Sequence, residues 1–315
     1  SLKPMKKSMH WRSVLLFASL WLSASTQAYQ GELHQQLTFM SAKQLSRCMT
    51  AWQDMDTALA QHSHDPLSAL EMRYVVRANV ANAKGNFFGR MFRWNYYDVT
   101  RDDSQRVIGM FATRFNSRFE EVLGQLKSAP ESRQRLEAFG ELLSYLQDVS
   151  TPSRVVPVYT GRWWAFNMQD RFDRFPIDDV RLESNGPKLC DEIAEIGEGL
   201  INDDIGAGLK SLLTKTAANT LTSVNQEIPG MPANWTSFWR PSEKNSGADF
   251  GDYGRAGNNF GNRVEFRCAT EAEPKMRCLL LTDDPLYQEF AFTRHRDALR
   301  STMLAMLLVQ RQGEL

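Results

Sequence analysis

The chain has 315 residues, of which 42% are hydrophobic and 23% are charged. This composition is typical of a globular protein and excludes a disordered, collagen-like or coiled-coil chain. The 37 basic residues balance the 37 acidic residues, so we expect no binding of duplex nucleic acid, which needs a basic surface.

Residues 1–28 have the pattern of a secretory signal peptide. Basic residues precede a short apolar run at 14–22, and small and polar residues follow up to Ala28. The run is shorter than the ~20 apolar residues that cross a bilayer, and no later segment is long and apolar enough, so we expect no transmembrane segment in the mature chain. We therefore predict a periplasmic or secreted protein whose mature chain begins near Tyr29, with a retained membrane anchor as the alternative.

Most of the mature chain has apolar residues at the spacing of amphipathic helices. This periodicity predicts helices at 33–62, 67–82, 104–126, 130–146, 187–201, 209–221 and 286–309. We therefore expect a mainly α fold.

Residues 225–262 interrupt the helical pattern with prolines and many glycines. Two runs of alternating apolar residues follow, at 263–269 and 276–282, and predict a β-hairpin. We expect one domain in three parts: a helical core at 29–224, a Gly/Pro-rich insertion with the hairpin at 225–282, and a last core helix at 283–315.

Two groups of aromatic residues leave alternatives open. The groups are Trp163, Trp164 and Phe166, and Trp235, Phe238 and Trp239. On the surface they would contact a lipid or a protein partner, whereas inside the protein they would fill its core.

Four cysteines in an exported chain predict two disulfides. Cys268 and Cys278 flank a turn between the two alternating runs, so we expect them to join the hairpin. Cys48 and Cys190 would then pair across a long loop. Two free buried thiols are the alternative, which an oxidising compartment disfavours.

Three local patterns follow one another along the chain. They are Tyr29 with His34 five residues later, Ser144-x-x-x-Asp148 with Pro152-x-Arg154, and Gln169-x-x-x-Asp173. Their order resembles the superfamily of zinc-dependent phospholipases C and single-strand nucleases, whose motifs read His-x-x-x-Asp, Pro-x-His and His-x-x-x-Glu or Asp. The resemblance covers roughly residues 29–224 and the last helix. It implies a helical, exported fold in which three zinc ions activate water and neutralise a phosphodiester.

The resemblance places eight residues at positions of the family's metal ligands: Tyr29, His34, Asn95, Ser144, Asp148, Arg154, Gln169 and Asp173. Tyr29, where the family usually has Trp, would supply its terminal amine and carbonyl. His34 keeps its imidazole and two aspartates keep their carboxylates, but the other four residues stand where the family has His. Asn, Ser and Gln are weak donors to zinc, and Arg stays protonated. We therefore expect no three-zinc cluster and no cofactor.

Arg154 follows Asp148 by six residues, around a proline-containing turn. We predict that its guanidinium replaces the missing metal as the counterion of a buried pair, Asp148 and Asp173, because buried carboxylates without a cation are unstable. A solvent-exposed Arg154 without a partner is the alternative.

Two functions are consistent with these residues. The first is a non-catalytic protein that keeps the scaffold and binds a lipid, a nucleotide or a protein, as an inhibitor or immunity-type protein would. The second is a metal-dependent phosphodiesterase with a reduced zinc site at Tyr29, His34, Asp148 and Asp173, in which Asp148 is catalytic. A serine nucleophile at Ser144 is disfavoured because no histidine is near it in the sequence. We favour the binding protein, with an unknown protein or phospholipid as its partner.

Overall fold

Helices dominate the computed structural model of the chain, so the predicted mainly α fold is confirmed. The structure describes residues 28–53, 66–84, 96–97, 115–156, 158, 170–200, 204–241 and 251–311. The signal peptide expected at 1–28 falls almost wholly outside these residues. Among the described helices, none is long and apolar enough to cross a membrane.

All seven predicted helical segments contain a helix. In chain order the α-helices are α2 (Ala28–Trp52), α4 (Ala69–Lys84), α6 (Phe115–Ser128), α7 (Ser132–Asp148), α8 (Pro152–Val155), α9 (Asp179–Ser184), α10 (Gly186–Leu200), α11 (Ile205–Asn225) and α12 (Pro285–Arg311). The predicted helical residues 54–62 and 104–114 lie outside the described residues. The short helices α8 and α9, and the 3-10 turns η1 (Phe172–Arg174) and η2 (Trp235–Ser237), were not predicted, because three to six residues are too few to show a helical period.

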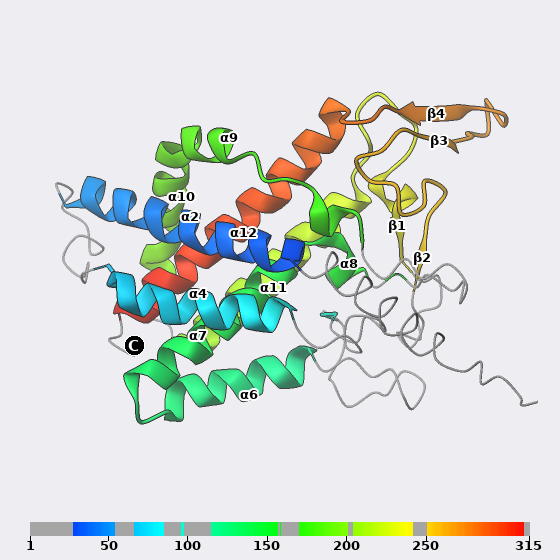
Figure 1. Ribbon diagram of the computed structural model, residues 1–315. Coiled ribbons are helices and arrows are strands. Elements are labelled where there is room, and N and C mark those ends of the chain that lie inside the picture. The colour runs from blue at the N-terminus through cyan, green and yellow to red at the C-terminus, as the bar shows by residue number, and fades with distance from the viewer. Residues whose placement is uncertain are drawn as a thin grey trace, which may run out of the picture.

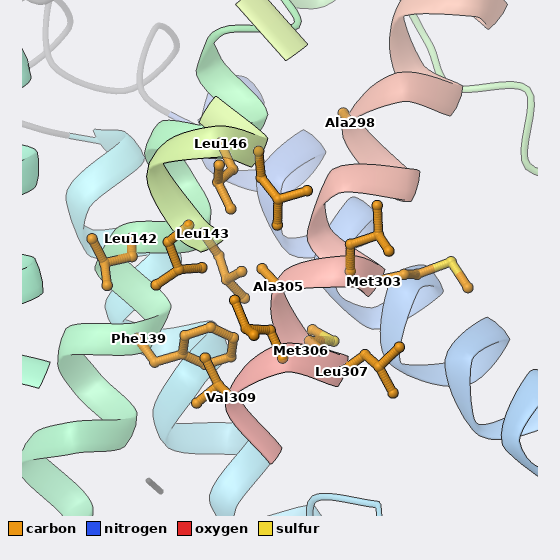
Figure 2. Close-up of a cluster of buried hydrophobic side chains, with 14 of the residues drawn as sticks. Phe139, Leu142, Leu143, Leu146, Ala298, Met303, Ala305, Met306, Leu307 and Val309 are labelled. Atoms are coloured by element: carbon orange, nitrogen blue, oxygen red, sulfur yellow. The ribbon is translucent and has the colours of Figure 1, made fainter. Parts of the chain in front are cut away.

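The larger hydrophobic core lies between the long helices. Helix α7 packs against α4, α6 and α12, and α2 lies alongside α4 and crosses α12 (Figure 1). Apolar side chains of α7 and α12 meet in the centre of this core. Figure 2 shows this for Phe139, Leu142, Leu143, Leu146, Ala298, Met303, Ala305, Met306, Leu307 and Val309. The apolar stripes found in the sequence are therefore the faces that these helices bury.

A second core, rich in aromatic rings, lies beside the N-terminal end of α12. Its rings are Phe172, Phe175, Trp235, Phe238, Trp239, Phe260, Phe266, Tyr287 and Phe290. The rings of Trp235 and Phe290 lie 4.5 Å apart, and those of Phe260 and Tyr287 lie 4.7 Å apart. The aromatic residues of the insertion therefore fill a core. The other aromatic group, Trp163, Trp164 and Phe166, lies outside the described residues.

The insertion contains two small antiparallel sheets. Strand β1 (Trp239–Arg240) pairs with β2 (Asp252–Tyr253), and β3 (Val264–Arg267) pairs with β4 (Arg277–Leu280). The second pair is the predicted hairpin, and it lies at one end of the molecule (Figure 1). Its alternating burial directs apolar side chains of both strands into the aromatic core.

Both predicted disulfides are confirmed. Cys268–Cys278 closes the hairpin across 10 residues, and Cys48–Cys190 joins α2 to α10 across 142 residues. Because the entropy that a cross-link removes from the unfolded chain grows with loop length, the long-range bridge is expected to stabilise the fold more.

Helices α4 and α7 approach each other closely because α7 has a glycine at the contact. A Cβ atom added at Gly140 would lie 2.1 Å from the carbonyl oxygen of Val75. This contact sets the distance at which α4 side chains reach the C-terminal half of α7.

Substitution of this glycine should separate the two helices. We expect Gly140→Ala to lower the free energy of unfolding by about 1–3 kcal/mol, measured by urea denaturation. Gly124 in α6 is the matched control, because a Cβ there meets nothing within 4 Å. Gly124→Ala should stabilise the protein by up to about 1 kcal/mol through helix propensity. Equal effects of both substitutions would contradict the role given to Gly140.

Candidate functional site

Three of the predicted site residues line one small cavity. It has a volume of about 40 Å³ and lies among α2, the C-terminal end of α7, η1 and α12. Its lining includes His34, Asp148, Ser150, Phe172, Asp173 and His295. The fold thus brings together His34, Asp148 and Asp173, which come from three separate parts of the chain.

Ser144 does not line this cavity. The hydroxyl of Ser144 accepts a hydrogen bond from the side-chain amide of Asn82 on α4 and donates one to the carbonyl oxygen of Glu141 (2.7 Å). It therefore joins α7 to α4 instead of lining the cavity. Two predicted residues and one side chain lie outside the described part of the chain: Asn95, Gln169 and the side chain of Tyr29.

His34 is held by two neighbouring residues of α7. Its Nδ1 lies 2.6 Å from Oε1 of Gln147, and its Nε2 lies 3.2 Å from Oδ1 of Asp148. An amide oxygen accepts hydrogen bonds and does not donate them, so Nδ1 carries the proton of the first bond. The second contact places Nε2 of the same ring against the Asp148 carboxyl.

The amide of Gln147 is itself fixed by a buried polar network. Its Oε1 also accepts a hydrogen bond from Nδ2 of Asn79 (3.1 Å), and its Nε2 donates to the hydroxyls of Thr38 (2.9 Å) and Thr302 (3.3 Å). Together with the bond from His34, these contacts occupy both the oxygen and the nitrogen of the amide. They therefore orient the amide oxygen towards His34. Sequence analysis missed Gln147, because a single glutamine inside a helical stripe carries no local signal.

Asp148 is the last residue of α7, where the helix ends before a proline turn. Both the backbone N–H (2.9 Å) and the hydroxyl (2.7 Å) of Thr151 donate to its carbonyl oxygen. Pro152 then opens α8, since proline suits the first turn of a helix and disfavours helical geometry in the residue before it. This turn returns the chain so that Arg154 lies beside Asp148.

Arg154 and Asp148 form a nearly buried ion pair. Nε of Arg154 lies 4.0 Å from Oδ1 of Asp148, with the side chains 13% and 11% exposed. At this distance the interaction is coulombic and not a hydrogen bond. Burial of the Asp148 carboxyl opposes its ionisation, but the charge of Arg154 and the His34 hydrogen bond together hold its pKa below the usual value.

Sequence analysis also missed Asp170, which ties η1 to the insertion. One carboxylate oxygen accepts the backbone N–H of Phe172 (2.9 Å). The other accepts Nε1 of Trp239 and the hydroxyl of Tyr253, both at 2.8 Å. Asp170 is therefore a structural residue that sets the position of Phe172, and with it one wall of the cavity.

His295, on α12, forms another part of the cavity wall. Burial, with a smaller contribution from the charge of Arg294, lowers the pKa of His295 to about 4, so the ring is neutral at pH 7. Its ring lies 5.7 Å from that of Phe172. Its placement on the buried face of a long amphipathic helix is typical of a core histidine, and nothing in the local sequence linked it to the other site residues.

The residues of this cavity do not fit a three-zinc cluster. Zinc binds a neutral imidazole through a free ring nitrogen, but both ring nitrogens of His34 face side-chain oxygens of α7. A guanidinium lies beside Asp148, a carboxylate that would hold the metal. Among the described residues, no group of three or more His, Cys, Asp or Glu side chains is arranged to hold a metal ion.

Removal of the Arg154 charge should destabilise the protein. Because Asp148 would keep its buried carboxylate without the nearby cation, Arg154→Met should lower the free energy of unfolding by about 3 kcal/mol at pH 7, measured by urea denaturation. Arg240→Met is the control, since the Arg240–Asp252 pair is 52% and 66% exposed and should contribute less than about 1 kcal/mol. Adding Asp148→Asn to Arg154→Met should restore part of the loss. Equal small losses in the two single variants would show that Arg154 is not the counterion.

The depressed pKa of His295 predicts a loss of stability in mild acid. The unfolded chain binds a proton near pH 6.5, whereas the folded chain binds it only near pH 4. The free energy of unfolding should therefore fall as the pH decreases from 6.5, by about 3 kcal/mol at pH 4. Asp148, whose pKa is lowered from 3.8, contributes stability that is lost only below this window. In urea titrations His295→Gln should have a shallower pH dependence than the wild type between pH 6.5 and 4.5, and equal slopes would contradict the assignment.

No protein-family model, curated protein or solved structure matches this chain. The function is therefore inferred from the contacts around the cavity and from the residues of the three motifs.

Proposed function

We propose that this chain is an exported, non-catalytic protein on a helical scaffold that resembles the zinc phospholipases C and nucleases, and that it binds a partner instead of hydrolysing a phosphodiester. The observation that carries the proposal is the contact of His34 with Gln147 and Asp148, beside Arg154. These contacts use the imidazole and carboxylate that a metal would need. Two disulfides support export to an oxidising compartment, periplasmic or extracellular.

The surroundings of Ser150 also favour a protein without metal-independent hydrolysis. A serine nucleophile needs a base within hydrogen-bond distance, but the buried hydroxyl of Ser150 has no hydrogen-bond partner among the described residues. The cavity volume of about 40 Å³ is also far below the roughly 300 Å³ of the smallest typical ligand pockets. A phosphodiester substrate therefore does not fit beside these groups.

A larger surface groove supports a protein as the partner. An open groove of about 740 Å³ lies between helices α4, α6 and α7. Small alanines and amides line it, and the arginines Arg77 and Arg133 are balanced by Glu137 and Glu141. None of the described lining residues is aromatic, and the charges balance. This lining suits the mixed polar surface of a peptide or protein better than a lipid chain, which needs an apolar wall, or a nucleotide, which favours basic and aromatic contacts.

Metal analysis and an activity assay test the loss of catalysis. The purified mature chain is dialysed against zinc and then against buffer, and its metal content is measured by elemental mass spectrometry. We expect no stoichiometric zinc. The chain should not hydrolyse a chromogenic choline phosphodiester, while an active zinc phospholipase C does so under the same conditions. Stoichiometric zinc with turnover that Asp148→Asn abolishes would establish the alternative, a phosphodiesterase with a reduced metal site at Tyr29, His34, Asp148 and Asp173.

The partner is tested by capture from a periplasmic extract. A protein retained by the wild type and lost with Ala81→Trp, which fills the groove, would support the proposed surface. Val180→Trp is the control, because Val180 on α9 is 77% exposed and lies outside the groove. Equal capture by both variants would exclude the groove as the binding surface.

A further inference from the structure

The small cavity lies at the junction of the two hydrophobic cores. Leu37 and Ala298, on one side, belong to the core of the long helices, and Phe172, on the other, belongs to the aromatic core. Polar residues also line this space, among them Asp148, Asp173 and Ser150. Empty cavities in proteins are lined by apolar groups, so this one has the lining of a space that holds a polar molecule.

Ser150 lines this cavity and has a buried hydroxyl. It follows α7 in the turn before α8, where its backbone N–H donates to the carbonyl oxygen of Gln147 (3.1 Å). Ser150 is 2% exposed, and its hydroxyl makes no hydrogen bond within the described part of the chain. Buried hydroxyls are almost always hydrogen-bonded to protein or to ordered water, so this hydroxyl indicates a bound molecule in the cavity.

Volume and charge restrict what that molecule is. About 40 Å³ is enough for one water, which needs roughly 10–15 Å³, and too little for an organic ligand. Two aspartates line the cavity, and the guanidinium of Arg154 lies 4.0 Å from the Asp148 carboxyl. A hydroxyl that lacks a partner beside carboxylate acceptors suits a small molecule that both donates and accepts hydrogen bonds.

We propose that this cavity is an internal water site, in which one ordered water bonds to the hydroxyl of Ser150 and to the Asp148 or Asp173 carboxyl. The water joins the end of α7 to η1, and so links the two cores by hydrogen bonds where apolar packing is interrupted. The neutral ring of His295 faces the same space and can donate to or accept from the water. This proposal does not depend on the identity of the partner.

A high-resolution crystal structure of the mature chain tests the site directly. We expect one isolated density peak within 2.6–3.2 Å of Oγ of Ser150 and of a carboxylate oxygen. A cavity without density would overturn the proposal. A peak with several ligands at roughly 2.0–2.2 Å, the distances of a zinc ion, would also overturn it.

The thermal stability of Ser150→Ala provides a second readout. If the hydroxyl binds the water, its removal should lower Tm by about 2–4 °C. If the hydroxyl is unpaired, its removal should leave Tm unchanged or raise it, which would overturn the proposal. Ser301→Ala is the matched control, because Ser301 is equally buried (2%) but donates to a backbone carbonyl of its own helix. It should change Tm by less than Ser150→Ala does.

Discussion

The carboxylate of Asp148 at the C-terminal end of α7 is the constraint on which the site depends. A helix C-terminus carries partial negative charge, and burial removes the water that would otherwise solvate the carboxylate. Arg154 and His34 compensate for both effects, since they lie 4.0 Å and 3.2 Å from the same carboxylate oxygen. The pKa of Asp148 stays low as a result, and the charge is kept inside the protein without a metal ion.

The surrounding fold positions this group through a few short contacts. The glycine at the α4–α7 contact lets Asn79 reach Gln147, and Gln147 in turn orients His34. The proline turn after α7 returns Arg154 to Asp148, and Asp170 anchors η1 to the insertion. The two cores therefore meet at a polar cavity that each of them partly encloses.

A metal-binding scaffold can keep its geometry while it loses its chemistry, because folds and functions vary independently. In the proposed function, the helical framework still gathers a histidine and two aspartates around one cavity. A guanidinium supplies the positive charge, but it cannot bind or activate water as a Lewis acid does. Such an exchange would preserve stability and free the protein for binding. The balanced polar groove of α4, α6 and α7 is then the surface on which a partner would act.

Local patterns in the sequence determined the long helices, the hairpin between Cys268 and Cys278, and both disulfides. Helical periodicity and turn residues are properties of short segments, and the number of cysteines is counted directly from the sequence. Tertiary structure alone decided that Trp235 and Trp239 are core residues, and that Gln147 and His295 belong to the site. Burial and contact between residues more than a hundred positions apart depend on how the helices pack. The packing of the helices cannot be read from any single segment. The sequence could therefore suggest His34, Asp148 and Asp173 but not the hydrogen-bond network that holds them.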